Sequence, residues 1–287
     1  MRVGHRVAKA SLLVLAGGLG TRFGGTKQLA AVGPGGAAIL DHSIREARNA
    51  GVERIVVVGR SDLDAELRSH LTSQHPDLEL TIVHQDCHGP RRVKPWGTGH
   101  AVISALSVID GPVVVLNADD YYGPTGIAMV AKSITEGRSD EVARGVMLGF
   151  RLGQTLPTSG SVSRGVCEVD GEGRLVSLVE THGIERRGDE IWASTPPGEL
   201  DPETPVSMNI WGLSVEVVTG LVGQWNEFLE TNAGSESIEF LLPVALDEQR
   251  QTGKLVVDVL DTEETWIGIT NRLDLVAARS AFAEIRH

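Results

Sequence analysis

A glycine-rich segment at residues 16–27 carries two cationic side chains, Arg22 and Lys27. Glycines let a backbone approach a ligand closely, and exposed amides together with Arg and Lys side chains attract negatively charged oxygens. The overlapping residues 11–16 are apolar and uninterrupted, as in a buried parallel strand that ends at such a loop. These features predict a polyphosphate-binding loop; the structural alternative is a strand-to-helix turn with incidental cations.

The segment differs from two common phosphate-binding loops. It contains no Gly-Lys-Ser/Thr sequence, which excludes a Walker P-loop. Phe23 stands where a dinucleotide fingerprint beginning at Gly18 requires its third glycine or alanine. Another kind of phosphate-binding site is therefore indicated.

Two carboxylates, Asp119 and Asp120, follow a second apolar run at residues 113–116. Ligands of open α/β sheets bind beyond the carboxyl ends of the strands, where the glycine-rich segment is also expected. Carboxylates placed there suit Mg²⁺, which takes one or two of them together with phosphate oxygens. Asp119 is the first metal candidate, and Asp120 is either a second ligand or the cap of the turn into the next helix.

The sequence Gly-Leu-Gly-Thr-Arg at residues 18–22, followed by Lys27, resembles the signature of the sugar-1-phosphate nucleotidyltransferases, also called nucleotide-sugar pyrophosphorylases. In that family the acidic strand end holds a metal ion on the nucleotide, and Asp119 falls on that position. The resemblance implies that Arg22 contacts the β and γ phosphates, and that Lys27 contacts the α-phosphate and the attacking phosphate. The nucleotide-binding residues that it implies are Ala16, Gly17, Gly18, Gly20, Thr21, Gly97 and Thr98.

The sequence Lys-Pro-Trp-Gly-Thr-Gly-His-Ala at residues 94–101 resembles the family's nucleobase-binding segment. The resemblance implies that Gly97 and Thr98 lie against the base, because a glycine admits a planar ring. Several relatives have a glutamine five residues before that glycine, where this chain has Arg92, so the identity of the base is left open. The three cations within residues 91–94 either contact phosphate or belong to a solvated loop.

Three segments look like the sugar-phosphate half of the family, and in them Gly165, Glu180 and Asn209 are implied to face the acceptor. A glycine permits close approach, while Glu and Asn side chains supply the hydrogen-bonding groups that polyols need. A solvated carboxylate is the structural alternative for Glu180.

One position departs from the family pattern. Many relatives have a late aspartate that completes the metal site, and this chain has Gly268 in its place. Either another group completes the site, for example Asp120 or Asn271, or Asp119, phosphate and water hold the metal.

The order of apolar runs and helical patterns predicts βαβ units in the first half of the chain. Near residue 142 the pattern changes to strands without long intervening helices, which predicts an antiparallel or mixed extension. The expected strands are residues 11–16, 54–58, 79–84, 112–116, 142–150, 165–169, 175–180, 206–213 and 255–260. The expected helices are residues 39–50, 62–71, 99–108, 215–230 and 237–251, with a last helix from residue 272.

These elements predict an α/β fold with a Rossmann-like, mostly parallel central sheet, helices on both faces and an acceptor-side extension. The resemblance implies the nucleotide-diphospho-sugar transferase fold. No Pro/Ser-rich linker divides the 287 residues, so we expect a single domain over residues 1–287. Residues 11–140 form its expected nucleotide-binding half, and residues 141–287 its sugar-phosphate-binding half.

The net charge of −12 argues against nucleic acid or an anionic membrane as the main partner. No apolar run reaches the length of a membrane span, and residues 1–10 lack the apolar stretch of a signal peptide, so we expect a cytoplasmic protein. Cys87 and Cys167 are expected to be reduced and to take no part in the chemistry. A homo-oligomer is possible.

The predicted function is Mg²⁺-dependent condensation of a nucleoside triphosphate with a sugar-1-phosphate, which releases pyrophosphate. One alternative keeps the fold and changes the acceptor: a cytidylyl- or guanylyltransferase acting on a polyol phosphate or a cofactor precursor. Another is a catalytically silent nucleotide-sugar-binding regulatory protein, which the missing aspartate at Gly268 keeps open.

Overall fold

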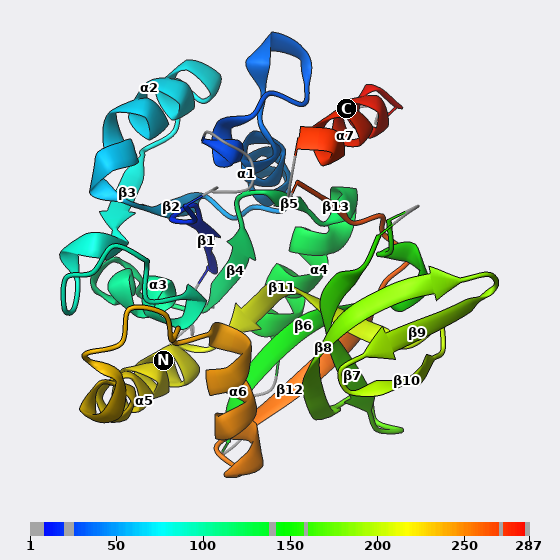
Figure 1. Ribbon diagram of the computed structural model, residues 1–287. Helices are drawn as coiled ribbons and strands as arrows, with labels where there is room; N and C mark the ends of the chain where they lie inside the picture. Colours follow the sequence, from blue (N-terminus) through cyan, green and yellow to red (C-terminus); the bar gives the residue numbers. More distant parts are fainter. Residues whose placement is uncertain (1–8, 20–25, 138–141, 158–159, 270–271, 285–287) are drawn as a thin grey trace, which may run out of the picture.

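The structure is a computed structural model that describes residues 9–19, 26–137, 142–157, 160–269 and 272–284. Four parallel strands in the order β3-β2-β1-β4 form the first part of a large sheet (Figure 1). They correspond to the four strands predicted for the first half of the chain. Their bounds are Ser11–Leu15 for β1, Arg54–Gly59 for β2, Thr81–His84 for β3 and Val113–Asn117 for β4.

The sheet continues from β4 into the second half of the chain through β11, which runs antiparallel to it. Beyond β11 the strands are mainly antiparallel, although β12 pairs with β6 in parallel. The bounds here are Ala143–Arg151 for β6, Val162–Val169 for β7, Leu175–Arg187 for β8, Glu190–Ser194 for β9, Pro197–Leu200 for β10, Pro205–Leu213 for β11 and Leu255–Asp261 for β12. A separate two-stranded ribbon joins β5 (Asp120–Tyr121) to β13 (Ile267–Gly268).

Helices cover both faces of the sheet, as predicted. One buried cluster packs α1, α2 and α4 against one face, and a second packs α3, α5 and α6 against the other. The C-terminal helix α7 packs beside α1 and the β5–β13 ribbon (Figure 1). The helix bounds are Ile39–Asn49 for α1, Asp64–Gln74 for α2, Thr98–Ser104 for α3, Gly123–Glu136 for α4, Val215–Asn232 for α5, Leu242–Gln251 for α6 and Arg272–Glu284 for α7.

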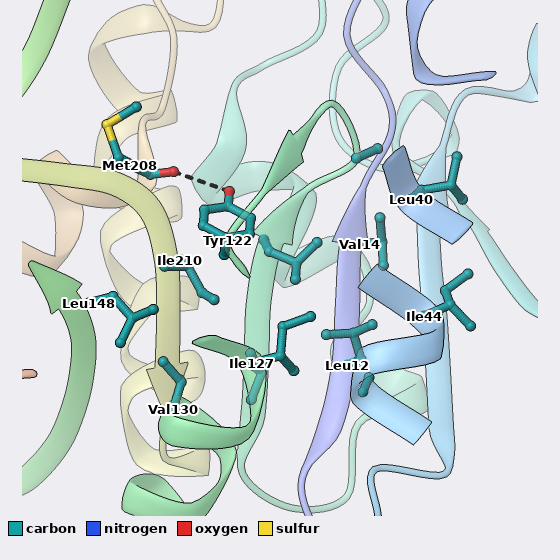
Figure 2. Packing of buried hydrophobic residues seen from close by; sticks show 14 of the residues in the cluster. Leu12, Val14, Leu40, Ile44, Tyr122, Ile127, Val130, Leu148, Met208 and Ile210 are labelled. Carbon is teal, nitrogen blue, oxygen red and sulfur yellow. Dashed lines mark hydrogen bonds between the residues drawn. The ribbon is translucent and has the colours of Figure 1, made fainter. Parts of the chain in front are cut away.

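The core joins the two halves of the chain at side-chain level. Figure 2 shows Leu12 and Val14 of β1 beside helix α1 on one side and strand β4 on the other. Alternate residues of a strand point to opposite faces, which accounts for the uninterrupted apolar run of β1: both of its faces are covered. The hydroxyl of Tyr122 donates a hydrogen bond of 3.1 Å to the carbonyl of Met208 in β11 (Figure 2).

Several boundaries differ from the sequence-based predictions, three of them by four residues or more. The helix expected over residues 237–251 begins at Leu242, with a proline at its start, and the one expected over 99–108 ends at Ser104 before a short 3₁₀ turn. Strand β8 continues to Arg187 and forms a three-stranded antiparallel arm with β9 and β10. The arm was not predicted, because β9 and β10 are short and bury only one face.

Candidate functional site

The carboxyl ends of β1 and β4 bring the two predicted motifs together. Leu15 and Asn117 are register partners, so the segment after β1 lies beside Asp119. The ammonium group of Lys27 is ion-paired with the carboxylate of Asp119, and both side chains are about four-fifths buried. Two residues 92 positions apart, chosen from separate motifs, thus meet at one point.

Side chains from neighbouring elements hold the backbone that follows β1. Gln28 donates to the carbonyl of Gly18 at 2.7 Å, and Arg60 donates to the carbonyls of Gly17 and Gly18 at 3.1 Å. A β-carbon at position 17 would lie 2.9 Å from Oε1 of Gln85, so a larger residue there would displace the Gln85 amide. Gly20, Thr21 and Arg22 lie outside the described residues, and their roles stay predictions.

Two cavities meet at Asn117 and Asp119. The first has a volume of about 390 Å³ and lies over the end of β1. Of the predicted nucleotide-binding residues, Gly17, Gly18, Gly97 and Thr98 line it, as does Lys27. The second, of about 260 Å³, is lined by the three predicted acceptor-binding residues, Gly165, Glu180 and Asn209, and by Asp120.

Gly97 and Thr98 have structural contacts that the sequence did not reveal. Gly97 has φ of 103°, and a β-carbon there would lie 2.6 Å from the carbonyl oxygen of Phe240. The hydroxyl of Thr98 accepts a hydrogen bond of 2.9 Å from the backbone of Leu242, at the start of α6. Both residues therefore fix one wall of the first cavity, in addition to lining it.

The sequence left two alternatives open for the cations of this loop, contact with phosphate or exposure to solvent, and the guanidinium of Arg92 instead makes contacts within the protein. Its guanidinium stacks over the ring of Trp96, 3.7 Å from the ring centroid. It donates at 2.5–3.0 Å to the carbonyls of Lys94, Pro95, Ser235 and Ile238. Arg92 therefore ties the loop before α3 to the loop before α6.

Gln85 is a cavity residue that sequence reasoning missed. It follows directly after β3 and is nearly fully buried. Its amide nitrogen donates to the carbonyl of Gly97 at 2.8 Å and contacts Nδ1 of His100 at 3.2 Å, while its Oε1 lies close to Gly17. Its place directly after β3 was the available signal, since Gly17 and Asp119 also follow strands closely.

His100 fixes the orientation of the Gln85 amide. Burial lowers the pKa of His100 to about 4, so the ring is neutral near pH 7. The ring also hydrogen-bonds the backbone of His88, which raises the pKa of His100 but less than burial lowers it. Since the Gln85 amide nitrogen donates to Nδ1, the carbonyl oxygen of Gln85 is the group left for a ligand.

The oxygen groups beside Asp119 fit a hard divalent cation. Burial, and then the negative charge of Asp119, raise the pKa of Asp120 to about 7, although the charges of Lys27 and Arg164 act in the opposite direction. Within the described ranges, no cluster of three or more His, Cys, Asp or Glu side chains is arranged to hold a metal. An Mg²⁺ ion held by Asp119 and Asp120 therefore needs oxygens from substrate and water, as this ion commonly does.

Gly268, where relatives have an aspartate, is register partner to Asp120 in the β5–β13 ribbon. A β-carbon at position 268 would lie 2.2 Å from the Trp266 ring and 2.6 Å from Oδ1 of Asp120. The Asp120 carboxylate and the Trp266 ring thus fill the space that a side chain at position 268 would need. Asn271, the other candidate replacement, lies outside the described residues.

The acceptor-side residues lie on adjacent strands. Gly165 in β7 and Glu180 in β8 are register partners, and Ser207 of β11 lies on the other side of Gly165. Sequence reasoning missed Arg164, which lines the second cavity under the ring of Trp266, 5.0 Å from the ring centroid. Burial lowers the pKa of Arg164, although the charges of Asp120 and Glu180 oppose that effect.

The chain is similar to one family model and to several known proteins. Residues 12–146 match the family model of the MobA-like NTP transferase domain. The chain is 28% identical over 279 residues to the bifunctional protein GlmU of Hyphomonas neptunium, covering 96% of this chain and 52% of that protein. It is 32% identical over 114 residues to GlmU of Corynebacterium diphtheriae, a match that covers 38% of this chain and 22% of that protein. The chain therefore spans about half the length, or less, of the curated relatives it matches.

Two solved structures share the fold. One, described as a "putative glucose-1-phosphate thymidylyltransferase" from Bacillus anthracis, superposes with a TM-score of 0.67, 15% identity and 97% coverage of both chains. The other, the inositol-1-phosphate CTP transferase of T. maritima, superposes with a TM-score of 0.62, 16% identity and coverage of 96% and 98%. Lys27 and Asp119, which form the ion pair beside the first cavity, both lie within residues 12–146, the part of the chain that matches the MobA-like NTP transferase domain.

Proposed function

We propose that this chain transfers a nucleotidyl group from a nucleoside triphosphate to a sugar-1-phosphate, in a magnesium-dependent reaction that releases pyrophosphate. The single observation that carries the proposal is the pair of cavities that adjoin at Asn117 and Asp119. One cavity contains the glycine-rich backbone and Lys27, and the other is lined by hydrogen-bonding side chains suited to a polyol. A donor and an acceptor bound in them would have their phosphates at the shared boundary.

In this reaction the protein positions the two substrates and offsets the negative charge of their phosphates. The acceptor phosphate oxygen attacks the α-phosphorus in line and pyrophosphate leaves, so no protein nucleophile is required. Lys27 is assigned to the α-phosphate and the attacking phosphate, and Arg22 to the β and γ phosphates and the leaving pyrophosphate. Mg²⁺ held by Asp119 and Asp120 would supply positive charge to the phosphate oxygens.

The Lys27–Asp119 ion pair is a property of the ligand-free site. Lys27 turns from the Asp119 carboxylate to phosphate when the nucleotide enters, which frees that carboxylate to bind a cation. Breaking a partly buried pair without replacing both partners is unfavourable. We therefore expect nucleotide and metal to bind together more tightly than either binds alone.

On the acceptor side, the proposal assigns Gly165, Glu180 and Asn209 to the sugar phosphate. On the donor side it assigns Gly97, Thr98 and the carbonyl oxygen of Gln85 to the nucleobase. The resemblance between this fold and a CTP transferase that acts on inositol-1-phosphate supports one alternative acceptor, a cyclic polyol phosphate. The reaction is the same, and only the occupant of the second cavity differs.

The test is a matrix of nucleoside triphosphates against sugar-1-phosphates and inositol-1-phosphate, assayed for pyrophosphate release with Mg²⁺. One combination should give turnover, and Lys27→Ala or Asp119→Ala should lower its kcat/KM by at least about a hundredfold, or about 3 kcal/mol of transition-state stabilisation. Circular dichroism should show both variants folded. Near-normal turnover in either would refute the assignments, and nucleotide binding with no turnover in the whole matrix would favour a regulatory protein.

A further inference from the structure

Asn209 has a backbone conformation that is unfavourable for a residue with a side chain. Its φ is 63°, and it is the one non-glycine with positive φ among the described residues. It lies between Ser207 and Trp211, where the register of β11 against β6 shifts. The left-handed conformation costs roughly 1 kcal/mol, although asparagine tolerates it better than most residues. A strained residue at a strand irregularity is a reason to examine what its side chain does.

The Asn209 side chain takes part in the first two of three consecutive hydrogen bonds. Nε1 of Trp211 donates to Oδ1 of Asn209 at 3.1 Å. Nδ2 of Asn209 donates to Oδ1 of Asn117 at 2.7 Å, and Nδ2 of Asn117 donates to Oδ2 of Asp120 at 2.9 Å. The row crosses from β11 to the end of β4 and ends at the candidate metal carboxylate.

The donor and acceptor roles in this row of hydrogen bonds are fixed by Trp211, the first donor. An indole nitrogen is a donor only, so the group of Asn209 that faces Trp211 must be its carbonyl oxygen. That choice turns the amide nitrogen of Asn209 toward Asn117 and, by the same logic, the amide nitrogen of Asn117 toward Asp120. Trp211 is fully buried, and burial prevents water from substituting for the indole donor.

We propose that Trp211, Asn209 and Asn117 form a positioning relay that holds one oxygen of Asp120 and leaves the other oxygen available for a divalent cation. The inference rests on the metal-dependent function proposed above. In this relay Asn209 helps to position Asp120, whereas the family resemblance implies only that Asn209 faces the acceptor.

The relay explains how Asp120 could act as a metal ligand in a chain that has Gly268 where the family pattern has an aspartate. Oδ2 of Asp120 receives the Asn117 donor, whereas Oδ1 is the oxygen that lies 2.6 Å from the β-carbon position of Gly268. The free oxygen therefore occupies the place of the missing side chain. A carboxylate that is held at one oxygen keeps its orientation in the absence of metal, which lowers the cost of binding it.

The test measures Mn²⁺ binding to the nucleotide-free protein by the loss of the free-ion EPR signal. Trp211→Phe removes the donor and keeps an aromatic ring, and Asn209→Ala removes the middle link. Each should raise the Mn²⁺ dissociation constant about tenfold, the lower end of the usual effect of losing a ligand's outer partner. Because the links act in series, the double variant should bind Mn²⁺ no more weakly than the weaker single variant.

Trp192→Phe is the matched control, since it removes an indole donor to Glu190 in the β9 strand, away from both cavities. Melting temperatures are recorded for every variant. Wild-type Mn²⁺ affinity in Trp211→Phe overturns the relay, as does an Asn209→Ala variant that raises only the KM of the acceptor. A wild-type protein that binds no Mn²⁺ without nucleotide overturns the relay, as does unchanged Mn²⁺ binding in both variants. The proposed function fails separately, if the wild-type protein releases no pyrophosphate with any substrate pair of the matrix.

Discussion

At the scale of single residues, Gly268 stands where the family pattern that the sequence resembles has an aspartate. Restoring that aspartate with Gly268→Asp should damage the site, because the new side chain would collide with Trp266 and with Oδ1 of Asp120. Overpacking of this kind costs about 1–3 kcal/mol. We expect a lower melting temperature and weaker Mn²⁺ binding, measured by thermal unfolding and EPR.

Gly198→Ala is the control for this prediction, because a β-carbon at position 198 meets no atom within 4 Å. Combining Gly268→Asp with Trp266→Ala removes the ring from the collision and should recover part of the lost melting temperature. If Gly268→Asp alone binds Mn²⁺ more tightly than the wild type, the space at position 268 is not filled as described.

Lys27 and Asp119 were chosen from the sequence because each lies in a segment that follows a predicted strand, and the structure shows that the two side chains are ion-paired. Their roles in binding stay predictions. Gln85 was not predicted, because the family pattern places a glutamine five residues before Gly97, where this chain has Arg92. The intervening loop is long enough for Arg92 to turn away and bind carbonyls. Only the folded loop reveals which of two polar residues faces the cavity.

At the scale of elements, the loop before α3 depends on Arg92. Replacing it with lysine keeps the charge but gives up the planar donor array and the stacking on Trp96. Lys94 and Pro95 of this loop line the first cavity, so Arg92→Lys should raise the KM for nucleotide about three- to tenfold with kcat nearly unchanged. Steady-state kinetics checks this, with Arg91→Lys at the exposed neighbouring position as control. Equal effects of the two variants would show that the contacts of Arg92 do not hold the loop in place.

Helices α1 and α2 are joined through the buried carboxylate of Asp41. It accepts hydrogen bonds from His70 at 2.7 Å, His75 at 3.0 Å and the backbone of Ala38 at 2.7 Å. Burial alone would raise the pKa of Asp41, but these hydrogen bonds lower it to about 2, from an ordinary 3.8. The charged form is therefore favoured in the folded state.

The sign of the pH effect follows from that lowered value. Because the folded pKa of Asp41 lies below the unfolded one, its stabilisation is complete above about pH 4 and is lost as the pH falls toward 2. The contribution is about 2 kcal/mol. In urea titrations between pH 6 and pH 3, Asp41→Asn should be the less stable protein at pH 6, and its deficit should shrink at pH 3.

The control for Asp41 is Asp189→Asn, a substitution in the exposed turn between β8 and β9. Its unfolding free energy should follow that of the wild type across the whole pH range. A deficit in Asp41→Asn that stays constant from pH 6 to pH 3 would show that the carboxylate stabilises the helices by packing and not by its charge.

At the scale of the whole molecule, the single domain expected from the absence of a linker remains a prediction, and the fold gives a physical reason for it. Strand β11 pairs with β4 through Trp211 and Leu213, so the sheet does not stop between the two halves. Each large buried cluster draws residues from both halves, for instance Leu12 with Ile210. Sequence patterns predicted the strands but not this pairing, because periodicity carries no information about which strands become neighbours.

The two halves should therefore unfold together. In peptide-resolved hydrogen exchange at increasing urea, β2 of the first half and β12 of the second should lose protection at the same urea concentration. A fragment ending at Gly137 lacks the partners of the apolar face of β4 and should show no cooperative transition, whereas mixing it with a fragment beginning at residue 142 should restore one. Separate urea midpoints for β2 and β12 would instead show that the two halves unfold independently, and that the nucleotide-binding half is a domain of its own.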